Sequence, residues 1–398
     1  MSNATLHCDV AIVGAGLVGL AAAVALHQAG FSVVLVDSKN PAKVDYADDV
    51  WDTRIYAISP KNAQWLSRLG VWQLLDPTRI GEMQGMEIFG DAKQTPLTLL
   101  ADHANADHLG FIVESKALMH ALLQQVEALG IHTLFDSPCE AVNTTPSKAT
   151  LQLASKRMIE SSLLLAADGS NSWVRQQLSI AIQQKPYLQT ALVANLTVEK
   201  SHANIARQWF AQDADGRLSI LAWLPLPNNT ISIVWSVSTK FADSLLALAE
   251  DEFIKRLMEA GGAKLGEMKL LNTVAAFPLN LQTTNTPVQD CVVLVGDAAH
   301  QVHPMAGQGV NLGFRDVIDL VENLKEKNQY QAINDSGLLK HYTRLRKADL
   351  LNMLLLTDGL YQLFESQNGL VKNVRNFGLS VTKQQAIKKV LVANAITL

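Results

Sequence analysis

Three glycines near the N-terminus have the spacing of a phosphate-binding turn. Gly14, Gly16 and Gly19 form the pattern G-x-G-x-x-G, which allows a tight turn, a close backbone approach to a pyrophosphate and close packing of a helix on a strand. The N–H groups at the start of the following helix favour phosphate oxygens. Asp37 lies 23 residues after Gly14, where a carboxylate can accept hydrogen bonds from ribose hydroxyls. These residues predict a dinucleotide site, and they fit NAD and FAD equally well.

Two further glycine–aspartate turns narrow that choice. Asp168-Gly169 opens a D-G-x-x-S-x-x-R pattern that ends at Arg175, and Gly296-Asp297 follows a five-residue apolar run. Alone, an Asp-Gly pair is most often a plain turn, and an arginine at this spacing is often an exposed helix residue. An acid at a strand end, however, binds polyol hydroxyls, and a glycine-rich helix start stabilises negative charge on a flat ligand. A reduced flavin is such a ligand, so the set favours FAD.

Apolar runs and helical stretches surround these turns. Residues 8–13 and 31–36 are predicted strands on either side of a helix over 17–29, which makes a βαβ unit with parallel strands buried on both faces. Ser59-Pro60 has the pattern of an N-cap followed by a first-turn proline, and a longer helix is expected over 116–129. The N-terminal part of the chain is therefore predicted to be α/β.

The middle of the chain has a different pattern. From residue 187 to 238, apolar and polar residues alternate, with Asp215-Gly216 and Asn228-Asn229 between the runs, where hairpin turns belong. An antiparallel sheet is expected here. A helix over 242–260 follows, and helical patterning returns over 337–364 and 383–395.

Composition excludes several classes of protein. The 398 residues are 48% hydrophobic and 18% charged, which excludes a disordered chain. The net charge of -4 argues against a nucleic-acid partner. Three widely spaced cysteines, Cys8, Cys139 and Cys291, make no disulfide framework and no zinc site, so a reducing compartment is expected. The uncharged stretch 10–26 has no Lys or Arg before it and contains the three glycines, which argues against a signal peptide or membrane span.

Taken together, the three turns resemble those of the single-component FAD aromatic hydroxylases, the para-hydroxybenzoate hydroxylase superfamily. Within it, three segments are similar to the ubiquinone-biosynthesis hydroxylases: Asp52-Thr53-Arg54-Ile55-Tyr56-Ala57-Ile58-Ser59, Gly110-Phe111-Ile112-Val113-Glu114, and residues 303–313. The similarity extends from about Cys8 to the C-terminal helices. Many relatives have Gly-Asn where this chain has Gly296-Asp297, which leaves the subfamily open.

The resemblance implies an α/β fold in three parts. A Rossmann-like FAD-binding domain would comprise residues 1–75, 107–182 and 272–335. An antiparallel-sheet substrate domain, residues 76–106 and 183–271, would interrupt it. Residues 336–398 would form a helical C-terminal tail.

The resemblance also assigns a role to each motif. The ADP half of FAD would be held by Gly14, Gly16, Gly19 and Asp37, its phosphates by Arg54, its ribityl chain by Gly296 and Asp297, and its isoalloxazine ring by Pro304, Gly307, Gln308, Gly309, Val310 and Asn311. Asp168 would contact FAD and NAD(P)H, directly or through loop geometry. The alternative for Arg54 is a surface salt bridge. No catalytic base is assigned. His300 and His303 form H-x-x-H, but no metal is expected because a third ligand and an acidic partner are missing from the pattern; His300 is expected to cap or pack.

The implied activity is that of an FAD-dependent aromatic-ring monooxygenase. NAD(P)H would reduce tightly bound FAD as a transient partner without a Rossmann unit of its own, and O₂ would form a flavin C4a-hydroperoxide. This species would hydroxylate a lipophilic polyprenylated phenol or benzoquinol in ubiquinone biosynthesis, in company with other proteins of that pathway. Two alternatives are a hydroxylase of a small soluble aromatic and a structural FAD-binding partner in a biosynthetic complex.

Two apolar groups have competing interpretations. Trp209, Phe210, Trp223 and Trp235 are candidates for the wall of a substrate pocket, although ordinary core packing is favoured for each. Leu350, Leu351 and residues 353–356 are crowded on one helix, where core packing is the first explanation and a membrane or partner surface the second. Lys383, Lys388 and Lys389 could support membrane contact or simply be solvated. A cytoplasmic protein is expected, with peripheral contact at the inner membrane.

Overall fold

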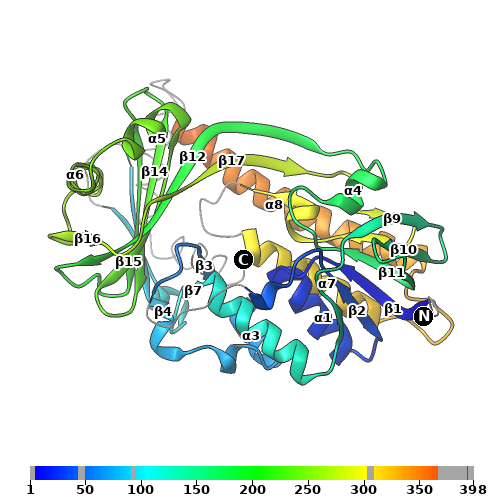
Figure 1. Cartoon of the computed structure of the whole chain (residues 1–398). Helices are drawn as coiled ribbons and strands as arrows, with labels where there is room; N and C mark the ends of the chain where they lie inside the picture. The colour runs from blue at the N-terminus through cyan, green and yellow to red at the C-terminus, as the bar shows by residue number, and fades with distance from the viewer. Residues whose placement is uncertain (1–4, 44–49, 91–95, 303–308, 366–391, 393–398) are drawn as a thin grey trace.

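The computed structural model of the chain describes residues 5–43, 50–90, 96–302, 309–365 and 392. Figure 1 shows two lobes. One lobe contains β1 (Leu6–Val13) and β2 (Val33–Val36) with α1 (Leu17–Gln28), α3 (Ser115–Ala128) and α7 (Gly309–Lys325) beside them. The other contains β14 (Leu218–Leu226) and β15 (Thr230–Ser238) with α5 (Thr239–Leu246) and α6 (Glu250–Ala260). Two long strands, β12 and β17, run from one lobe to the other.

The first lobe is built on an eight-stranded sheet with the order β18-β19-β11-β1-β2-β8, while β10 pairs with β11 and β9. Its strands are β1 (Leu6–Val13), β2 (Val33–Val36), β8 (His132–Leu134), β9 (Cys139–Thr144), β10 (Ala149–Leu153), β11 (Met158–Ala166), β18 (Val288–Gln289) and β19 (Val292–Leu294). The neighbours β19, β11, β1 and β2 are parallel. Because the carboxyl ends of parallel strands meet at one edge, the predicted turns after β1, β2, β11 and β19 are brought to the same edge of the sheet.

Helices α1 (Leu17–Gln28), α3 (Ser115–Ala128) and α7 (Gly309–Lys325) pack with this sheet. Nine of the twelve residues of α1 are buried, so the helix is apolar on nearly every side, as is typical of a helix enclosed between layers. The predicted βαβ unit is confirmed. The helix ends at Gly30, whose φ of 91° closes it.

The second lobe is a nine-stranded sheet with the order β20-β17-β12-β15-β14-β13-β5-β6, and β16 pairs with β12. Its strands are β5 (Gly85–Phe89), β6 (Leu97–Leu100), β12 (Gln183–Val198), β13 (Ile205–Gln212), β14 (Leu218–Leu226), β15 (Thr230–Ser238), β16 (Met268–Leu270), β17 (Ala275–Thr283) and β20 (His300–Gln301). The predicted hairpin turns are confirmed: Gly216, Asn228 and Asn229 have φ values of 72°, 58° and 51°, the conformation that Gly and Asn tolerate best.

One segment of the chain belongs to a different lobe from the one predicted from the sequence. Residues 272–335 were expected in the FAD-binding domain, whereas β17 pairs with β12 in the nine-stranded sheet and also with β20. Backbone hydrogen bonding decides membership of a sheet, and the pattern of side chains in β17 alone does not disclose its partner. As a result, β17 and β20 lead the second sheet directly to the turn at Gly296.

A small three-stranded sheet lies at the junction. It consists of β3 (Ile55–Ile58), β7 (Gly110–Glu114) and β4 (Gly81–Met83) in the order β3-β7-β4. Helix α2 (Pro60–Arg68) follows β3, and Ser59 caps it by accepting a hydrogen bond from the Asn62 N–H, as the Ser-Pro pair predicts.

The remaining helices complete the core. Helices α5 (Thr239–Leu246) and α6 (Glu250–Ala260) replace the single helix expected over 242–260, because the chain breaks at residues 247–249 and restarts with three acidic residues in the first turn of α6. Helix α4 (Trp173–Gln177) follows the Asp168 turn, and α8 (Ser336–Glu365) agrees with the predicted helix over 337–364. In the described part of the chain, no helix is long and apolar enough to cross a bilayer.

Candidate active site

A cavity of about 860 Å³ lies between the two lobes. It is lined on one side by residues of the predicted turns, among them Gly16, Leu17, Arg54, Gly169, Asp297, Gly309, Val310 and Asn311. On the other side it is lined by the nine-stranded sheet, with Ala191, Val193, Ala206, Gln208, Ile220, Ala222, Leu224, Val234 and Ser236. Motifs from three separate parts of the sequence therefore face one space.

The first turn is shaped as its glycines require. Gly14 has φ of 105°, and a Cβ atom on it would lie 2.4 Å from the Ala167 carbonyl oxygen. A Cβ on Gly19 would overlap the Gly14 carbonyl oxygen, so this glycine allows helix α1 to pack against the turn. Gly16 is different, because a Cβ there meets no described atom within 4 Å. Its backbone faces the cavity, beside an α1 N-terminus that has no side-chain cap and whose N–H groups are available to an anion.

Asp37 lies at the end of β2 and holds this turn. Its Oδ2 accepts a hydrogen bond from the Ala15 N–H at 2.6 Å, and its Oδ1 accepts one from the Lys39 N–H at 2.8 Å. A carboxylate has about four acceptor positions, so Asp37 can fix the turn and still accept a ribose hydroxyl.

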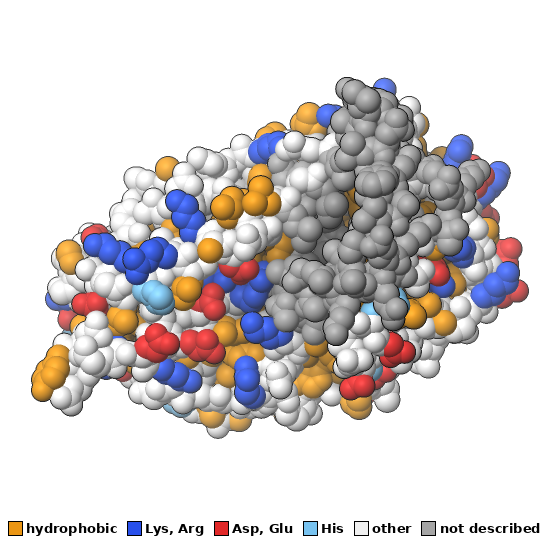
Figure 2. All heavy atoms as spheres, turned by 180° about the vertical axis from the view of Figure 1, so that it is seen from behind, with side chains coloured by type: hydrophobic (Ala, Val, Ile, Leu, Met, Phe, Trp, Pro, Cys, Tyr) orange, Lys and Arg blue, Asp and Glu red, His pale blue; other side chains and the backbone are white. Residues whose placement is uncertain are grey.

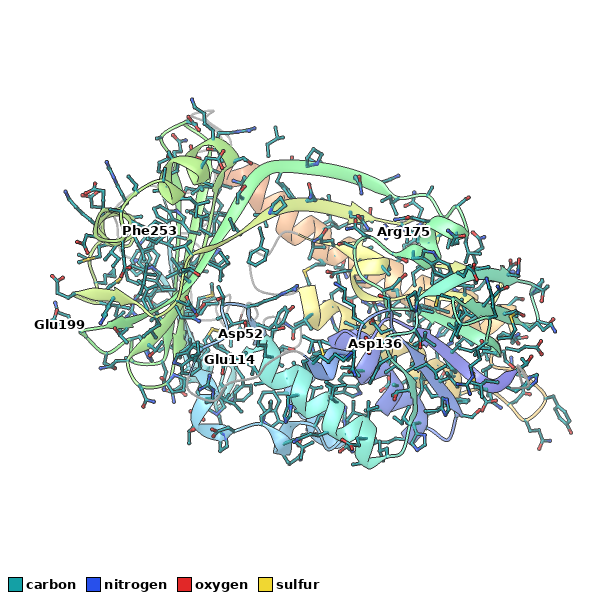
Figure 3. The ribbon with its side chains drawn as sticks, in the orientation of Figure 1. Asp52, Glu114, Asp136, Arg175, Glu199 and Phe253 are labelled. Carbon is teal, nitrogen blue, oxygen red and sulfur yellow. The ribbon has the colours of Figure 1, made fainter. Side chains whose placement is uncertain are left out.

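The segment that carries Arg54 is clamped by buried polar groups. Glu114, 1% exposed, binds the Arg79 guanidinium through both oxygens at 2.8 Å and accepts the Asp52 N–H at 2.6 Å. Asp52 in turn accepts the Lys116 N–H at the start of α3, and its carbonyl accepts a hydrogen bond from Asn195 of β12. Figure 3 shows Asp52 and Glu114 near each other at the junction of the lobes. This clamp was not predicted.

Arg54 itself is exposed at the cavity, with its guanidinium 5.4 Å from the centre of the Tyr56 ring. Burial raises the pKa of Tyr56, and the charge of Arg54 opposes that change. Tyr56 therefore keeps its phenol proton at neutral pH and offers a hydrogen-bond donor to the cavity. The sequence motif contains Tyr56 but gives no sign that its ring lies beside Arg54, which follows from the fold.

The Asp168 turn is fixed from both ends. Oδ2 of Asp168 accepts the Val174 N–H at 3.0 Å at the start of α4, whereas its Oδ1 is buried without a hydrogen-bond partner among the described residues. Burial raises the pKa of Asp168, against the effect of the hydrogen bond from Ser172. Arg175 is not the exposed helix residue that was considered: it is 4% exposed and donates to the carbonyls of Ser170 and Ala298. It thereby connects the second turn to the third (Figure 3).

The Gly296 turn is held by an acid in the following helix. Gly296 has φ of 57°, and its N–H donates to Asp316 Oδ2 at 2.8 Å. His300 Nε2 is 2.7 Å from the same oxygen. His300 thus has an acidic partner after all, contrary to the expectation from the H-x-x-H pattern, because α7 returns Asp316 to the turn. No group of three or more potential metal ligands is found in the described residues.

Helix α7 begins at the cavity. Gly309, Val310 and Asn311 line it, but the Asn311 side chain points elsewhere: it accepts from the Ser59 N–H and from Asn62 Nδ2, and it donates to the Ala57 carbonyl. Its amide therefore ties α7 to the segment after Arg54. His303, Pro304, Gly307 and Gln308 lie outside the described residues.

Comparison with known proteins agrees with this geometry. The family model described as FAD binding domain matches residues 7–353. The ubiquinone hydroxylase UbiL of Rhodospirillum rubrum is 33% identical over 395 residues, which cover 98% of this chain and 89% of that protein. The chain belongs to this FAD-binding family.

Two further comparisons, one with a relative and one with a solved structure, agree with this result. The 3-demethoxyubiquinol 3-hydroxylase of Escherichia coli is 32% identical, covering 96% of this chain and 98% of that protein. A crystal structure of Klebsiella pneumoniae HpxO complexed with FAD and uric acid superposes with a TM-score of 0.74 at 16% identity, covering 98% of this chain and 97% of that one, which shows the fold. The chain is an FAD-dependent monooxygenase of the predicted fold class, with FAD as cofactor and NAD(P)H as the reductant typical of the family.

The residues of the cavity fit FAD. Open space lies where a Cβ would stand on Gly16 and on Gly309, so backbone can approach a flat or phosphorylated ligand at both positions. The carboxylate of Asp297, which lines the cavity, supplies acceptors for hydroxyl groups. Burial raises the pKa of Asp297, while the charges of His300 and Arg54 lower it.

The aromatic residues proposed as a pocket wall do not line the cavity. Trp223 and Trp235 are in the cluster between the sheet and the helices α5 and α6, and Trp209 packs against Trp223. Phe210 stacks on Phe364 of α8. Core packing, the favoured alternative, is therefore confirmed. The two-residue period of a strand turns the three tryptophans away from the cavity while their neighbours face it. Phe210 lies on the cavity-side face of β13, with Gln208, but packs in the cluster of Ile220 and Phe364 and does not line the cavity.

Proposed function

We propose that this FAD-dependent enzyme hydroxylates the aromatic ring of a polyprenylated phenol or benzoquinol in ubiquinone biosynthesis. The observation that supports this most directly is the shared cavity, which joins the FAD motifs to an apolar surface large enough for a ring. Both relatives compared above are named as hydroxylases of ubiquinone or of a demethoxyubiquinol, and their chains match this one over nearly its whole length.

The sheet side of the cavity suits a lipophilic ring. Methionine and leucine side chains of the junction and of β5–β6 supply much of its apolar lining: Met83, Met86, Leu99 and Leu109. Gln208 and Ser236 face the same space and can bind a phenolic or quinol oxygen. A pocket that is mostly apolar with a few fixed polar groups is typical of small-molecule sites.

Each group of residues has a distinct task in this proposal. The turn at Gly16 and the α1 N-terminus would hold the FAD pyrophosphate, with Arg54 as a countercharge. Asp297 would accept the ribityl hydroxyls, and the backbone at Gly309–Asn311 would border the flavin ring. Bound FAD, once reduced by NAD(P)H, supplies the activation of O₂ for the hydroxylation. The apolar sheet face would exclude water and align the aromatic ring, which would limit the unproductive release of hydrogen peroxide.

Contact with the bilayer would occur through α8. The crowded apolar residues of α8 include buried and exposed side chains: Met353 is 1% exposed and packs with Val302 and Leu312, whereas Leu351 and Leu355 are 54% and 66% exposed. The exposed side chains of Lys340, Arg344 and Lys347 precede them on α8, in the manner of a helix that lies on an anionic membrane surface. On the face shown in Figure 2, basic and acidic side chains are otherwise interspersed. Association with other proteins of a biosynthetic complex stays a prediction from the sequence.

Sedimentation with vesicles tests this contact. The double variant Leu351→Ser/Leu355→Ser should bind phosphatidylglycerol-containing vesicles more weakly than the wild type, and the same change at the exposed Leu246 of α5 should have no effect. Equal sedimentation of all three proteins would contradict the proposed contact.

Flavin retention tests the cofactor assignment. Asp297→Ala should lose bound FAD because it removes the ribityl acceptor, and Gly16→Val should lose it because the new side chain fills the open space at the pyrophosphate. Absorbance of the purified proteins gives the flavin content. Asp243→Ala, an exposed position on α5, is the matched control and should keep full occupancy. Stoichiometric FAD in the Asp297→Ala or Gly16→Val protein would contradict the assignment.

Coupled turnover tests the reaction. NADH and NADPH oxidation, oxygen consumption and hydrogen peroxide release are measured with a prenylated phenol, with a soluble phenol and without substrate. We expect oxidation that ends in a hydroxylated prenylated ring with little peroxide. Coupled product from soluble phenols alone would instead support a hydroxylase of small aromatics, and FAD that NAD(P)H never reduces would support a structural role.

A further inference from the structure

The backbone that leads to Arg54 is held by a chain of hydrogen bonds that begins at a buried ion pair. Glu114, at the end of β7, has a side chain that is 1% exposed, and the Arg79 side chain paired with it is 13% exposed. Arg79 Nε and Nη2 each donate to one oxygen of Glu114 at 2.8 Å, a two-point contact that fixes the direction of both groups. Arg79 Nη2 also donates to the Val50 carbonyl at 3.1 Å, and its guanidinium lies 4.5 Å from the centre of the Trp51 ring. The pair therefore fixes the chain at residues 50 and 51.

The same ion pair reaches Arg54 through one further residue, Asp52 (Figure 3). The Asp52 N–H donates to Glu114 Oε1 at 2.6 Å, and Asp52 Oδ1 accepts the Arg54 N–H at 3.1 Å. Asp52 Oδ2 accepts the Lys116 N–H at 2.9 Å, and the Arg54 carbonyl accepts the Ser115 N–H at 2.9 Å. Both backbone polar groups of Arg54 are thus hydrogen-bonded, and a direct contact joins each step from Glu114 to Arg54.

Residues of the second lobe hold this segment from the other side. Asn195 of β12 is 0% exposed and donates to the Asp52 carbonyl at 2.8 Å. Asn272, which precedes β17, donates to the Trp51 carbonyl at 3.3 Å. The place of Arg54 at the junction of the lobes is therefore fixed by contacts with both of them.

The side chain of Arg54 is the part of this segment that is open to a ligand. It is exposed at the cavity that Gly16 also lines, and its guanidinium lies beside the Tyr56 ring. Among the described residues, no acidic side chain forms an ion pair with it. A guanidinium binds phosphate oxygens through two parallel N–H donors, so the strength of that contact depends on where the arginine is placed.

We propose that Glu114 is a positioning residue that, together with Arg79 and through Asp52, holds Arg54 where its guanidinium binds the pyrophosphate of FAD. A buried ion pair often adds little net stability, because the cost of removing two charges from water offsets their attraction. Its contribution here is a fixed direction for the chain. Glu114 is not among the residues that line the cavity, so it acts on the cofactor only through Arg54. This role rests on the assignment of Arg54 to the FAD phosphates under Proposed function.

A double-mutant cycle on FAD affinity separates positioning from a general loss of structure. FAD release on dilution of each holoenzyme, followed by flavin fluorescence, gives the dissociation constant. Arg54→Gln should raise this constant about tenfold to a hundredfold, the usual effect of losing a hydrogen bond to a charged group. Glu114→Gln should raise it roughly fivefold, because Arg54 is present but no longer held. In the Arg54→Gln background, Glu114→Gln should change it by no more than about twofold.

A second variant tests the same link without disturbing the ion pair. Glu114→Gln leaves the Arg79 charge without its partner and lowers stability, whereas Asp52→Ala removes only the half-buried acceptor of the Arg54 N–H and of the Lys116 N–H. Asp52→Ala should raise the FAD dissociation constant roughly fivefold, again only while Arg54 is present.

Glu87→Gln is the matched control, because it breaks the partly buried ion pair between Glu87 of β5 and Arg207 of β13 in the second sheet. It should leave the FAD dissociation constant unchanged. Losses that multiply in the Glu114→Gln/Arg54→Gln double variant would overturn the proposal, because independent structural effects add in free energy. Wild-type affinity in both Glu114→Gln and Asp52→Ala would overturn it too, as would a loss in Glu87→Gln as large as that in Glu114→Gln.

The salt dependence of FAD affinity is a readout that a merely structural role would not change. Added salt screens the attraction between the exposed Arg54 and a phosphate, so wild type and Glu87→Gln should lose affinity between about 0.05 M and 0.5 M KCl. Arg54→Gln and Glu114→Gln should lose less. A Glu114→Gln protein with the wild-type salt dependence would contradict the positioning role. Failure of the cofactor assignment is recognised separately: Arg54→Gln would then bind FAD like the wild type, whereas failure of this inference alone leaves Arg54→Gln weak and the two losses multiplying.

Discussion

The two faces of the nine-stranded sheet differ although their residues alternate along the same strands. The face towards α5 and α6 carries large side chains such as Trp223, Ile233 and Trp235, which are 1%, 0% and 3% exposed. The face towards the cavity has Ala222 and Ser236 at neighbouring positions of the same strands. Along β14, Ala222 and Trp223 are adjacent and point in opposite directions.

This contrast shows how the chain makes room for a ligand. Large apolar side chains fill the space under the helices to the density of a protein interior, and Phe253 of α6 contributes to that filling (Figure 3). On the opposite face, Ala191, Ala206 and Ala222 leave space. The cavity-side face therefore contains alanines among its aliphatic residues, whereas the opposite face contains the tryptophans that pack under α5 and α6.

The largest predicted effect is the loss of stability when a large side chain is removed from the sheet face that packs against α5 and α6. Trp223→Ala removes a side chain that contacts Trp209 and lies against Gly261, so we expect a loss of about 3–5 kcal/mol in the free energy of unfolding. Urea denaturation followed by circular dichroism measures it. The folded fraction should still bind FAD at the wild-type ratio, because the cavity face is unchanged. A loss below about 1 kcal/mol would contradict the assignment of this face as the core.

A smaller loss of stability is expected when a side chain is added to the packed cluster on the same face. A Cβ on Gly261 would lie 2.0 Å from the Trp223 ring, and a rigid ring in a packed cluster has little room to move. Gly261→Ala should therefore destabilise the protein by about 1–3 kcal/mol. Gly261 has φ of -88°, so its alanine variant meets crowding without backbone strain. Gly359→Ala on α8, where a Cβ meets no described atom within 4 Å and φ is not positive, is the comparison without crowding and should not destabilise the protein. A loss in Gly261→Ala no larger than in Gly359→Ala would indicate that crowding at Trp223 is negligible.

Much of the first lobe was predictable because its signals are local. Gly14, Asp168 and Gly296 each follow an apolar run, and parallel strands necessarily bring such turns to one edge. The strand alternation also predicted the antiparallel sheet. It did not predict which face of that sheet borders the cavity, since a period of two assigns Trp223 and Ala222 to opposite faces without saying what covers either.

The residues that were missed depend on distant partners. Asp316 reaches His300 from 16 residues away and Arg346 from 30 residues away, and Arg79 reaches Glu114 across 35 residues. No local spacing marks such pairs, because they form only when separate helices and strands pack. A buried charge in α7 or at the end of β7 is the one signal that could have suggested them: an unpaired Asp or Glu among apolar residues requires a partner.

Filling the cavity face should change turnover more than stability. Ala222→Leu places a larger side chain in the cavity, so we expect kcat/KM for the prenylated substrate to fall roughly tenfold, equivalent to about 1.4 kcal/mol. The free energy of unfolding should change by less than about 1 kcal/mol, since the space is open to a ligand. Steady-state coupled turnover and urea denaturation are compared on the same preparation. Unchanged turnover would contradict the assignment of this face to the substrate.

The smallest predicted effects are those of removing two serine hydroxyls, Ser219 and Ser236, which lie on opposite faces of the sheet. Ser219 accepts a hydrogen bond from Trp235 Nε1 at 3.0 Å within the covered face, whereas Ser236 faces the cavity. Ser219→Ala leaves a buried indole N–H without its acceptor and should cost about 1 kcal/mol of unfolding free energy. Ser236→Ala should cost less than about 0.5 kcal/mol but raise KM, because the lost hydroxyl served the ligand and not the core. If the two variants exchanged these properties, the sheet would have been assigned the wrong way round, since each serine reports on the face to which it belongs.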